Sequence, residues 1–334
     1  MKDKIRFGVI GFSRVAKKSA LPALITSPFV EVLMIGSRDP ETARTYTKEY
    51  GSISFGTYDE VITHPDIDAV YISLPNTLHE KWTIKAARAG KHVWCEKPAA
   101  LLYKSAQKMV RVARDNNVRL IEGFSFLFHP QHAKVLSIIN EGVLGKILSF
   151  EGTFIYPKPE KGNIRLDPAL GGGSYTDAAV YPIRASRMIF REEPVSISCN
   201  LTIDPNIGVD VKASIELIYA NARTARISSG FGDDYQSNYS VNGSLARLSM
   251  ERAYAVPPDR EVHIYLENPD SVKNIAVPPA NQFTLLINDF CTQIILGINS
   301  KKRYEQDLLL QARILEAGIR SHTENRVVQL CEIH

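Results

Sequence analysis

Two segments of the sequence hold residue types that can donate, accept and stabilise a proton. Lys97 lies in the tetrapeptide Cys-Glu-Lys-Pro at 95–98, and Asp177 and Tyr181 lie in a segment at 171–181 that opens with three glycines. Spaced i and i+4, Asp177 and Tyr181 share one face of a helix. The pKa of a phenol is ordinarily about 10, and a neighbouring ammonium lowers it, which improves the phenol as a proton donor near neutral pH. We therefore expect Lys97, Tyr181 and Asp177 to be catalytic, although a tyrosine at this spacing packs against a sheet about as often.

A glycine turn near the N-terminus has the spacing of a dinucleotide-binding loop. Residues 7–16 pass from an apolar strand through Gly11 into a helical pattern. The middle glycine of the fingerprint, which lets the backbone approach a pyrophosphate, is replaced by Ser13, so an ordinary strand–turn–helix remains an alternative. Because a helix N-terminus offers its N–H groups to phosphate, the residues expected to hold a cofactor here are Gly11, Phe12, Ser13, Arg14 and Val15.

The end of the second expected strand indicates which dinucleotide would bind. An NAD-selective site usually has a carboxylate there for the ribose 2′-hydroxyl, whereas this chain has Ser37 and Arg38. A hydroxyl and a guanidinium suit a 2′-phosphate by charge and by hydrogen bonding. We predict a preference for NADP(H), with NAD(H) as the alternative; the competing interpretation is that Arg38 is a solvated surface residue.

The elements that must position these residues follow from the apolar periodicity. Up to about residue 123, expected strands at 5–10, 30–37, 69–74, 92–95 and 119–122 alternate with expected helices at 15–26, 41–50, 78–89 and 102–116. Such alternation indicates βαβ units and a parallel, doubly wound α/β sheet, whose ligands bind beyond the carboxyl ends of the strands. Lys97 follows one of those ends directly.

The pattern changes after residue 123. Helices are expected at 131–140, 174–190, 283–298 and 306–322, with strands at 147–156 and throughout 195–277. We therefore expect a Rossmann domain over 1–123 and an α+β domain with a mostly antiparallel sheet over 124–334, the last helix being free to pack back on the first domain.

Composition narrows the class of protein. The chain has 334 residues, 44% of them hydrophobic, and a formal net charge of +4, too mild a charge for a nucleic-acid surface. Its four cysteines lie far apart without a Cys-x-x-Cys motif, so we expect no metal site and a reducing, cytoplasmic location. No apolar run approaches the roughly 20 residues of a membrane helix, and no signal peptide is evident.

Taken together, these landmarks resemble the Gfo/Idh/MocA oxidoreductases. They are the turn at Gly11, the pentapeptide Pro-Asn-Thr-Leu-His at 75–79, Glu-Lys-Pro at 96–98, and the segment 171–181. The resemblance implies a Rossmann domain, a second domain with a large open-faced sheet, and a catalytic role for Lys97. Many members have Asp-x-x-x-His where this chain has Tyr181 in the last position. That departure resembles the subgroup of sugar ketoreductases, glucose–fructose oxidoreductase and dimeric dihydrodiol dehydrogenase.

The resemblance also implies which further residues line the site. Cofactor contacts are expected from Leu74, Pro75, Asn76, His79, Glu96 and Lys97. Substrate contacts are expected from Lys97, Phe124, His129, Arg165, Asp177 and Tyr181. Two alternatives stay open, because Arg165 suits an interdomain ion pair as well as a diphosphate, and His129 is equally compatible with a structural role.

The segments 126–132, 162–165, 180–184 and 281–283 are similar to nucleotide-diphosphate-sugar 3-ketoreductases. The implied reaction is hydride transfer between NADP(H) and a keto carbon of a dTDP-linked deoxysugar. Tyr181 would donate the proton, Lys97 would polarise the carbonyl or donate in its place, and Asp177 would orient a substrate hydroxyl. An NADP-dependent aldose or trans-dihydrodiol dehydrogenase, a non-catalytic NADP-binding regulator and a structural protein are the alternatives. A homodimer or homotetramer through the open sheet face is expected, with no nucleic-acid or membrane partner.

Overall fold

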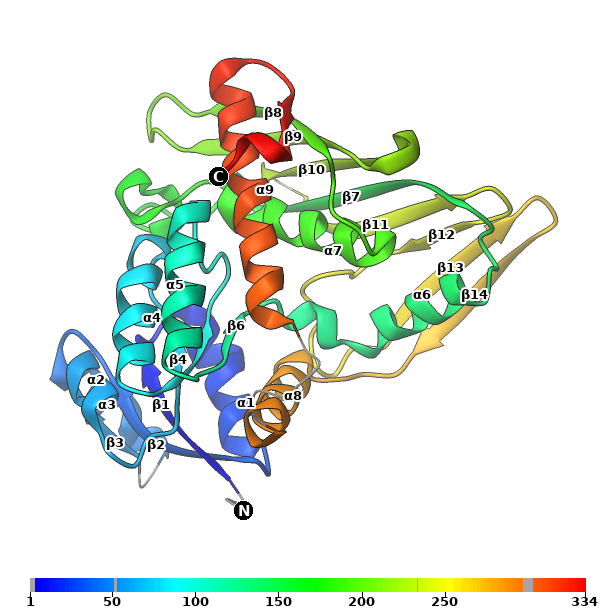
Figure 1. The fold of residues 1–334 in the computed structure, drawn as a ribbon. Coiled ribbons are helices and arrows are strands. Elements are labelled where there is room, and N and C mark those ends of the chain that lie inside the picture. Colours follow the sequence, from blue (N-terminus) through cyan, green and yellow to red (C-terminus); the bar gives the residue numbers. More distant parts are fainter. Residues whose placement is uncertain (1–3, 51–52, 233, 297–302) are drawn as a thin grey trace. The chain divides into compact units, whose positions relative to one another are not determined.

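The computed structural model describes residues 4–50, 53–232, 234–296 and 303–334 (Figure 1). By their contacts they form two compact units, one of Met1–Phe124 with Phe283–Leu309 and the other of Ser125–Gln282 with Leu310–His334. Phe283–Leu309 follows the boundary expected near residue 123 but belongs to the first unit.

A six-stranded parallel sheet forms the centre of the first unit, in the order β3-β2-β1-β4-β5-β6. The strands are β1 (Ile5–Ile10), β2 (Val30–Gly36), β3 (Ser54–Gly56), β4 (Ala69–Ile72), β5 (His92–Cys95) and β6 (Leu120–Glu122). All four residues of β4 are buried, as expected for a strand covered on both faces. This is the strand order of a doubly wound dinucleotide-binding sheet, so the predicted Rossmann architecture is confirmed.

Helices connect these strands (Figure 1). They are a π-helical turn η1 (Ala16–Ala20), α1 (Leu21–Thr26), α2 (Pro40–Thr47), α3 (Tyr58–Thr63), α4 (His79–Arg88) and α5 (Tyr103–Asp115). The later helix α8 (Gln282–Leu296) also packs in this unit. The sequence did not predict β3 or α3. β3 left no clear pattern because it has only three residues, of which Ser54 and Phe55 are exposed. Residues 297–298 of the helix expected at 283–298 lie outside the described residues.

A nine-stranded sheet dominates the second unit, in the order β14-β13-β12-β11-β7-β10-β9-β8-β15. Its strands are β7 (Ile147–Pro157), β8 (Ser196–Ile203), β9 (Asp210–Ile218), β10 (Thr224–Gly232), β11 (Gln236–Gly243), β12 (Arg247–Met250), β13 (Val262–Asn268), β14 (Ser271–Val277) and β15 (Val328–Gln329). Among the described strand pairs of this second sheet, only β7–β10 is parallel. The predicted mostly antiparallel sheet is therefore confirmed.

The two faces of this sheet differ. Phe150, Gly152 and Phe154 of β7 are buried, whereas Glu151 is exposed and Thr153 half-buried, which is the alternation of a strand with one covered face. Figure 1 shows α7 (Val180–Phe190) running along the covered face. The other face carries polar side chains of β7, β11, β12 and β13 around a hollow of about 460 Å³.

The remaining helices are α6 (Pro130–Asn140), a π-helical turn η7 (Tyr175–Ala179) that runs into α7, and α9 (Tyr304–Glu324). Within the described ranges, no helix is both long and apolar enough to cross a lipid bilayer.

Candidate functional site

Gly11 makes the turn after β1 in a conformation that other residues avoid. Its φ is +87°, and its N–H donates to the carbonyl oxygen of Gly36 over 3.1 Å. A Cβ placed on Gly11 would lie 2.6 Å from the carbonyl oxygen of Ser73 and 2.6 Å from the side chain of Leu74. Both the backbone angle and the close approach of the β4 end therefore require glycine.

Ser13 occupies the place of the second fingerprint glycine and fixes the turn instead. Its hydroxyl is hydrogen-bonded to the hydroxyl of Ser73 and accepts the N–H of Ala16 at 3.2 Å. The neighbouring Arg14 is exposed at the start of the helix, and Phe12 lies beneath the ammonium of Lys17, 5.1 Å from its ring centroid. The loop thus offers the exposed cation of Arg14 at a helix N-terminus, as suits an anion site.

Ser37 and Arg38 lie at the carboxyl end of β2. The N–H of Ser37 donates to Gly56 at 2.9 Å, which anchors this end against β3. Arg38 is exposed and lies close enough to the phenol of Tyr58 to affect its pKa. Burial raises the pKa of Tyr58 and the charge of Arg38 opposes this. Sequence reasoning missed Tyr58 because it lies 20 positions from its partner.

Lys97 lies just beyond the end of β5, half-buried, in a cis peptide bond with Pro98. The preceding Glu96 accepts a hydrogen bond from the phenol of Tyr71 at 2.9 Å and from the N–H of Lys97 at 3.4 Å. Because Tyr71 belongs to β4, Glu96 ties the Lys97 loop to the neighbouring strand. Glu96, which was expected among the cofactor contacts, has this anchoring role in the structure.

His79 opens α4, and its imidazole is buried. One ring nitrogen lies 2.8 Å from the carbonyl oxygen of Leu74 and the other 2.8 Å from that of Pro98. Burial lowers the pKa of His79, and the charge of Lys97 acts in the same direction. His79 therefore holds together the two loops that carry Pro75, Asn76 and Lys97.

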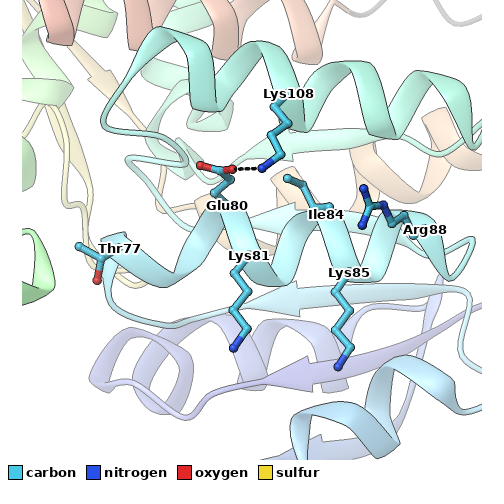
Figure 2. A pocket seen from close by; sticks show the side chains of 7 residues that line it. All are labelled: Thr77, Glu80, Lys81, Ile84, Lys85, Arg88 and Lys108. Carbon is cyan, nitrogen blue, oxygen red and sulfur yellow. Dashed lines mark hydrogen bonds and ion pairs between the residues drawn. The ribbon is translucent and has the colours of Figure 1, made fainter.

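A basic groove of about 640 Å³ runs along α4 and α5 (Figure 2). Lys81 and Lys85 project the same way from α4, and Lys108 of α5 forms an ion pair with Glu80 at 2.8 Å. None of the glycine-loop residues, nor Ser37, Arg38 or Lys97, lines this groove. The candidate cofactor residues lie instead at the strand ends, where an open α/β sheet binds its ligands.

In the second unit, Tyr181 stands in the first turn of α7 and Asp177 in the π-helical turn before it. The half-buried ring of Tyr181 packs among three aromatic rings, with centroid distances of 5.1 Å to Phe154, 5.7 Å to Phe126 and 5.9 Å to Tyr254. Packing and a chemical role are therefore compatible for Tyr181. Lys97 belongs to the first unit and Tyr181 to the second.

Asp177 is held by two neighbours that donate to the same carboxylate oxygen. Nε of Arg165 lies 2.7 Å from Oδ2 of Asp177, and the phenol of Tyr156 also donates to Oδ2. The charge of Asp177 raises the pKa of Arg165, while burial, followed by the same charge, raises the pKa of Tyr156. The structure thus joins Asp177 and Arg165, which the sequence predicted separately, and adds Tyr156, which it did not predict.

The glycine run at 171–173 makes this pairing geometrically possible. The N–H of Gly173 donates to the carbonyl oxygen of Arg165 at 2.9 Å, and a Cβ on Gly172 would lie 2.6 Å from the same oxygen. Asp210 of β9 then accepts the N–H of Tyr175 at 2.6 Å and the hydroxyl of Ser174 at 2.7 Å. These contacts fix the start of the helix that carries Asp177 and Tyr181.

Phe124 and His129 are both buried. Nδ1 of His129 accepts the N–H of Gln131 at 3.3 Å and so caps α6. Its Nε2 has no hydrogen-bond partner among the described residues. A neutral imidazole that accepts at Nδ1 carries its proton on Nε2, so His129 retains a buried donor. Within the same residues, no group of three His, Cys, Asp or Glu side chains could hold a metal ion.

Comparisons with known proteins cover nearly the whole chain. Residues 5–124 match a model described as an oxidoreductase family with an NAD-binding Rossmann fold, and residues 132–249 match the GFO/IDH/MocA C-terminal domain. The dTDP-3,4-didehydro-2,6-dideoxy-alpha-D-glucose 3-reductase of Actinomadura kijaniata is 34% identical over 94% of this chain and 95% of its own length.

Solved structures and a second type of relative agree with this. The crystal structure of a 3-ketoreductase from Actinomadura kijaniata, in complex with NADP and TDP-benzene, matches with a TM-score of 0.91 and 34% identity, covering 95% of this chain and 98% of that one. D-xylose 1-dehydrogenase (NADP(+)) 2 of Haloferax volcanii is 29% identical over 97% of this chain and 99% of its own. The chain therefore belongs to the GFO/IDH/MocA family of oxidoreductases.

Proposed function

We propose that this oxidoreductase uses NADPH to reduce a keto carbon of a nucleotide-linked deoxysugar. The observation that carries the proposal is the similarity over 94% of the chain to a dTDP-hexose 3-reductase. The structures of a 3-ketoreductase from the same organism, which contain NADP and TDP-benzene, support it.

The residues at the strand ends fit NADP(H). Gly11 permits the tight turn after β1, where a Cβ would collide with Ser73 and Leu74. The end of β2 presents the hydroxyl of Ser37 and the exposed guanidinium of Arg38 where an NAD site has a carboxylate. NADPH, when bound, supplies the hydride. The chain contributes the binding, the orientation and the charge.

The proton is assigned to Tyr181, which donates it to the forming alkoxide. Lys97 polarises the carbonyl and is the alternative donor, because an ammonium can give up a proton as a phenol does. The unpartnered Nε2–H of buried His129 is a further donor for a substrate oxygen. The resulting reaction class is ketone reduction by hydride transfer with general acid catalysis.

A free sugar is the second candidate substrate. The similarity to D-xylose 1-dehydrogenase (NADP(+)) 2 over 97% of the chain favours it. In that case the same residues would catalyse the oxidation of the sugar, with Tyr181 or Lys97 as the base that accepts the proton.

Thermal shift measurements with NADPH, NADH, dTDP, UDP, D-xylose and D-glucose separate these functions. A ligand that binds the native state alone stabilises it by about 2.7 kcal/mol at 100 times its Kd. We expect shifts with NADPH and dTDP, and a smaller shift with NADH because of Arg38. A shift with D-xylose but with neither nucleotide diphosphate would transfer the proposal to the aldose dehydrogenase, and no shift with either cofactor would contradict both.

We also propose self-association through the polar face of the nine-stranded sheet and a reducing compartment. The hollow between β7 and β13 supports the choice of this face for self-association. The four free cysteines, three of them buried, support the proposal of a reducing compartment. Analytical ultracentrifugation measures the oligomeric state and so tests the proposed self-association.

A further inference from the structure

Arg165 is fixed in place while most of its hydrogen-bonding capacity is unused. Among the described residues, its guanidinium is hydrogen-bonded only through Nε, to Asp177. The two terminal nitrogens carry four of the five N–H donors of an arginine, and the side chain is 29% exposed. A planar guanidinium whose terminal nitrogens are open is well suited to phosphate.

Hydrogen bonds fix both the backbone and the Nε side of the guanidinium of Arg165. The N–H of Arg165 donates to Oδ1 of Asn163 at 3.0 Å, and its carbonyl oxygen accepts from Gly173 at 2.9 Å. Asp177 takes the Nε edge of the guanidinium, and Tyr156 donates to the same carboxylate oxygen. An anion can therefore approach the opposite edge, formed by the terminal nitrogens, without meeting the carboxylate.

The distance from Tyr181 suits a sugar phosphate. Asp177 precedes Tyr181 by four residues, about 6 Å along a helix, so the Arg165 guanidinium is anchored one turn from the phenol. In a 3-keto sugar joined to phosphate at C1, a single ring carbon separates the keto carbon from the carbon that bears the phosphate. One substrate molecule can thus reach both groups.

We propose that Arg165 binds the phosphate joined to the sugar of the substrate, and that Asp177 and Tyr156 are positioning residues for its guanidinium. This rests on the proposed function, because only a nucleotide-linked or phosphorylated sugar supplies the anion. It gives Asp177 a role other than the orientation of a substrate hydroxyl.

Isothermal titration of the full chain with dTDP, thymidine and NADPH tests the proposal. For Arg165→Met we expect dTDP affinity to fall roughly 10- to 100-fold, the loss of charge-assisted hydrogen bonds, with the affinities for thymidine and NADPH unchanged. Tyr156→Phe should lower dTDP affinity by about 3- to 10-fold and raise KM for the nucleotide sugar with little change in kcat. Arg226→Met is the matched control, because Arg226 forms an exposed ion pair with Glu216 in the same unit.

The outcomes separate this inference from the function beneath it. Wild-type binding of dTDP that persists undiminished in Arg165→Met and Tyr156→Phe would overturn the inference and leave the ketoreductase standing. A wild-type chain that binds NADPH but neither dTDP nor UDP would overturn the proposed substrate, and the inference with it. If Arg165→Met does not fold, the result for Tyr156→Phe decides, because that variant removes one hydroxyl and keeps the packed ring.

Discussion

Acid should destabilise this protein through a buried imidazole, that of His132 in α6. The ring is 1% exposed, with Nε2 lying 2.9 Å from the carbonyl oxygen of Ala253 and Nδ1 lying 3.0 Å from the phenol of Tyr239. A carbonyl only accepts, so Nε2 carries the proton and the Tyr239 hydroxyl donates to Nδ1. This network is complete for the neutral ring.

Burial lowers the pKa of His132 to about 3, against about 6.5 in an unfolded chain. Above pH 6.5 both states leave the ring neutral, and the free energy of unfolding has its full value. As the pH falls below 6.5, only the unfolded state takes up the proton, and stability is lost by about 1.4 kcal/mol per pH unit until the folded ring also titrates. Between pH 7 and pH 5 the loss is about 2 kcal/mol.

The assay compares urea unfolding of the wild type and His132→Gln at pH 5, 6 and 7. Glutamine keeps a donor for the Ala253 carbonyl but does not titrate, so the wild-type stability should fall relative to the variant by about 2 kcal/mol over this range. Far-ultraviolet circular dichroism must be the probe, because Trp82 and Trp94, the two tryptophans, both lie in the first unit. His263→Gln, at a half-buried position of β13, controls for the loss of an imidazole as such.

The pH range is chosen to isolate imidazole titration. The buried His79 and His129 also have lowered pKa values and act in the same direction, so the difference between two variants, rather than the wild-type curve alone, carries the result. A stability difference that stays constant from pH 7 to pH 5 would refute the reasoning, because the ring would then be equally protonated in both states.

Two further outcomes are expected. Tyr181→Phe should lower kcat/KM by roughly 100-fold or more while leaving NADPH affinity intact, and near-normal turnover would reassign the proton to Lys97. Gly11→Ala should weaken NADPH binding and lower the melting temperature by more than Gly90→Ala does. Both glycines have positive φ, costing roughly 1–2 kcal/mol for alanine, but only at Gly11 would the Cβ also meet Ser73. Equal effects of the two substitutions would show that the close approach is unimportant.

The sheets could be predicted from the sequence because burial alone specifies them. Every residue of β4 is buried, and β7 alternates between a buried and a more exposed face. A continuous apolar run therefore predicts the first strand, and an alternating run predicts the second. The edge strand β3 could not be predicted in this way, because its exposed Ser54 and Phe55 bury too little surface to require an apolar pattern.

The site residues in the first unit follow strand ends, which is why their positions were accessible from the sequence. Their partners were not. Ser73 reaches Ser13 across 60 positions, and Tyr58 reaches Arg38 across 20, through strand order and register. The position at which a strand ends can be predicted from the sequence, whereas the residues that lie beside that end depend on the order and register of the strands in the sheet.

The three glycines at 171–173 show how a sequence can indicate a close approach without identifying the group that approaches. Gly173 has a φ of +118°, and a Cβ there would collide with the carboxylate of Asp210, while one on Gly172 would collide with the backbone of Arg165. The close approach of Asp210 and of the Arg165 backbone therefore explains why glycine is required at these two positions. Their effect is to fix the start of the helix and to bring Arg165 to Asp177, so the glycine run is best explained as structural support for the segment that carries Asp177 and Tyr181.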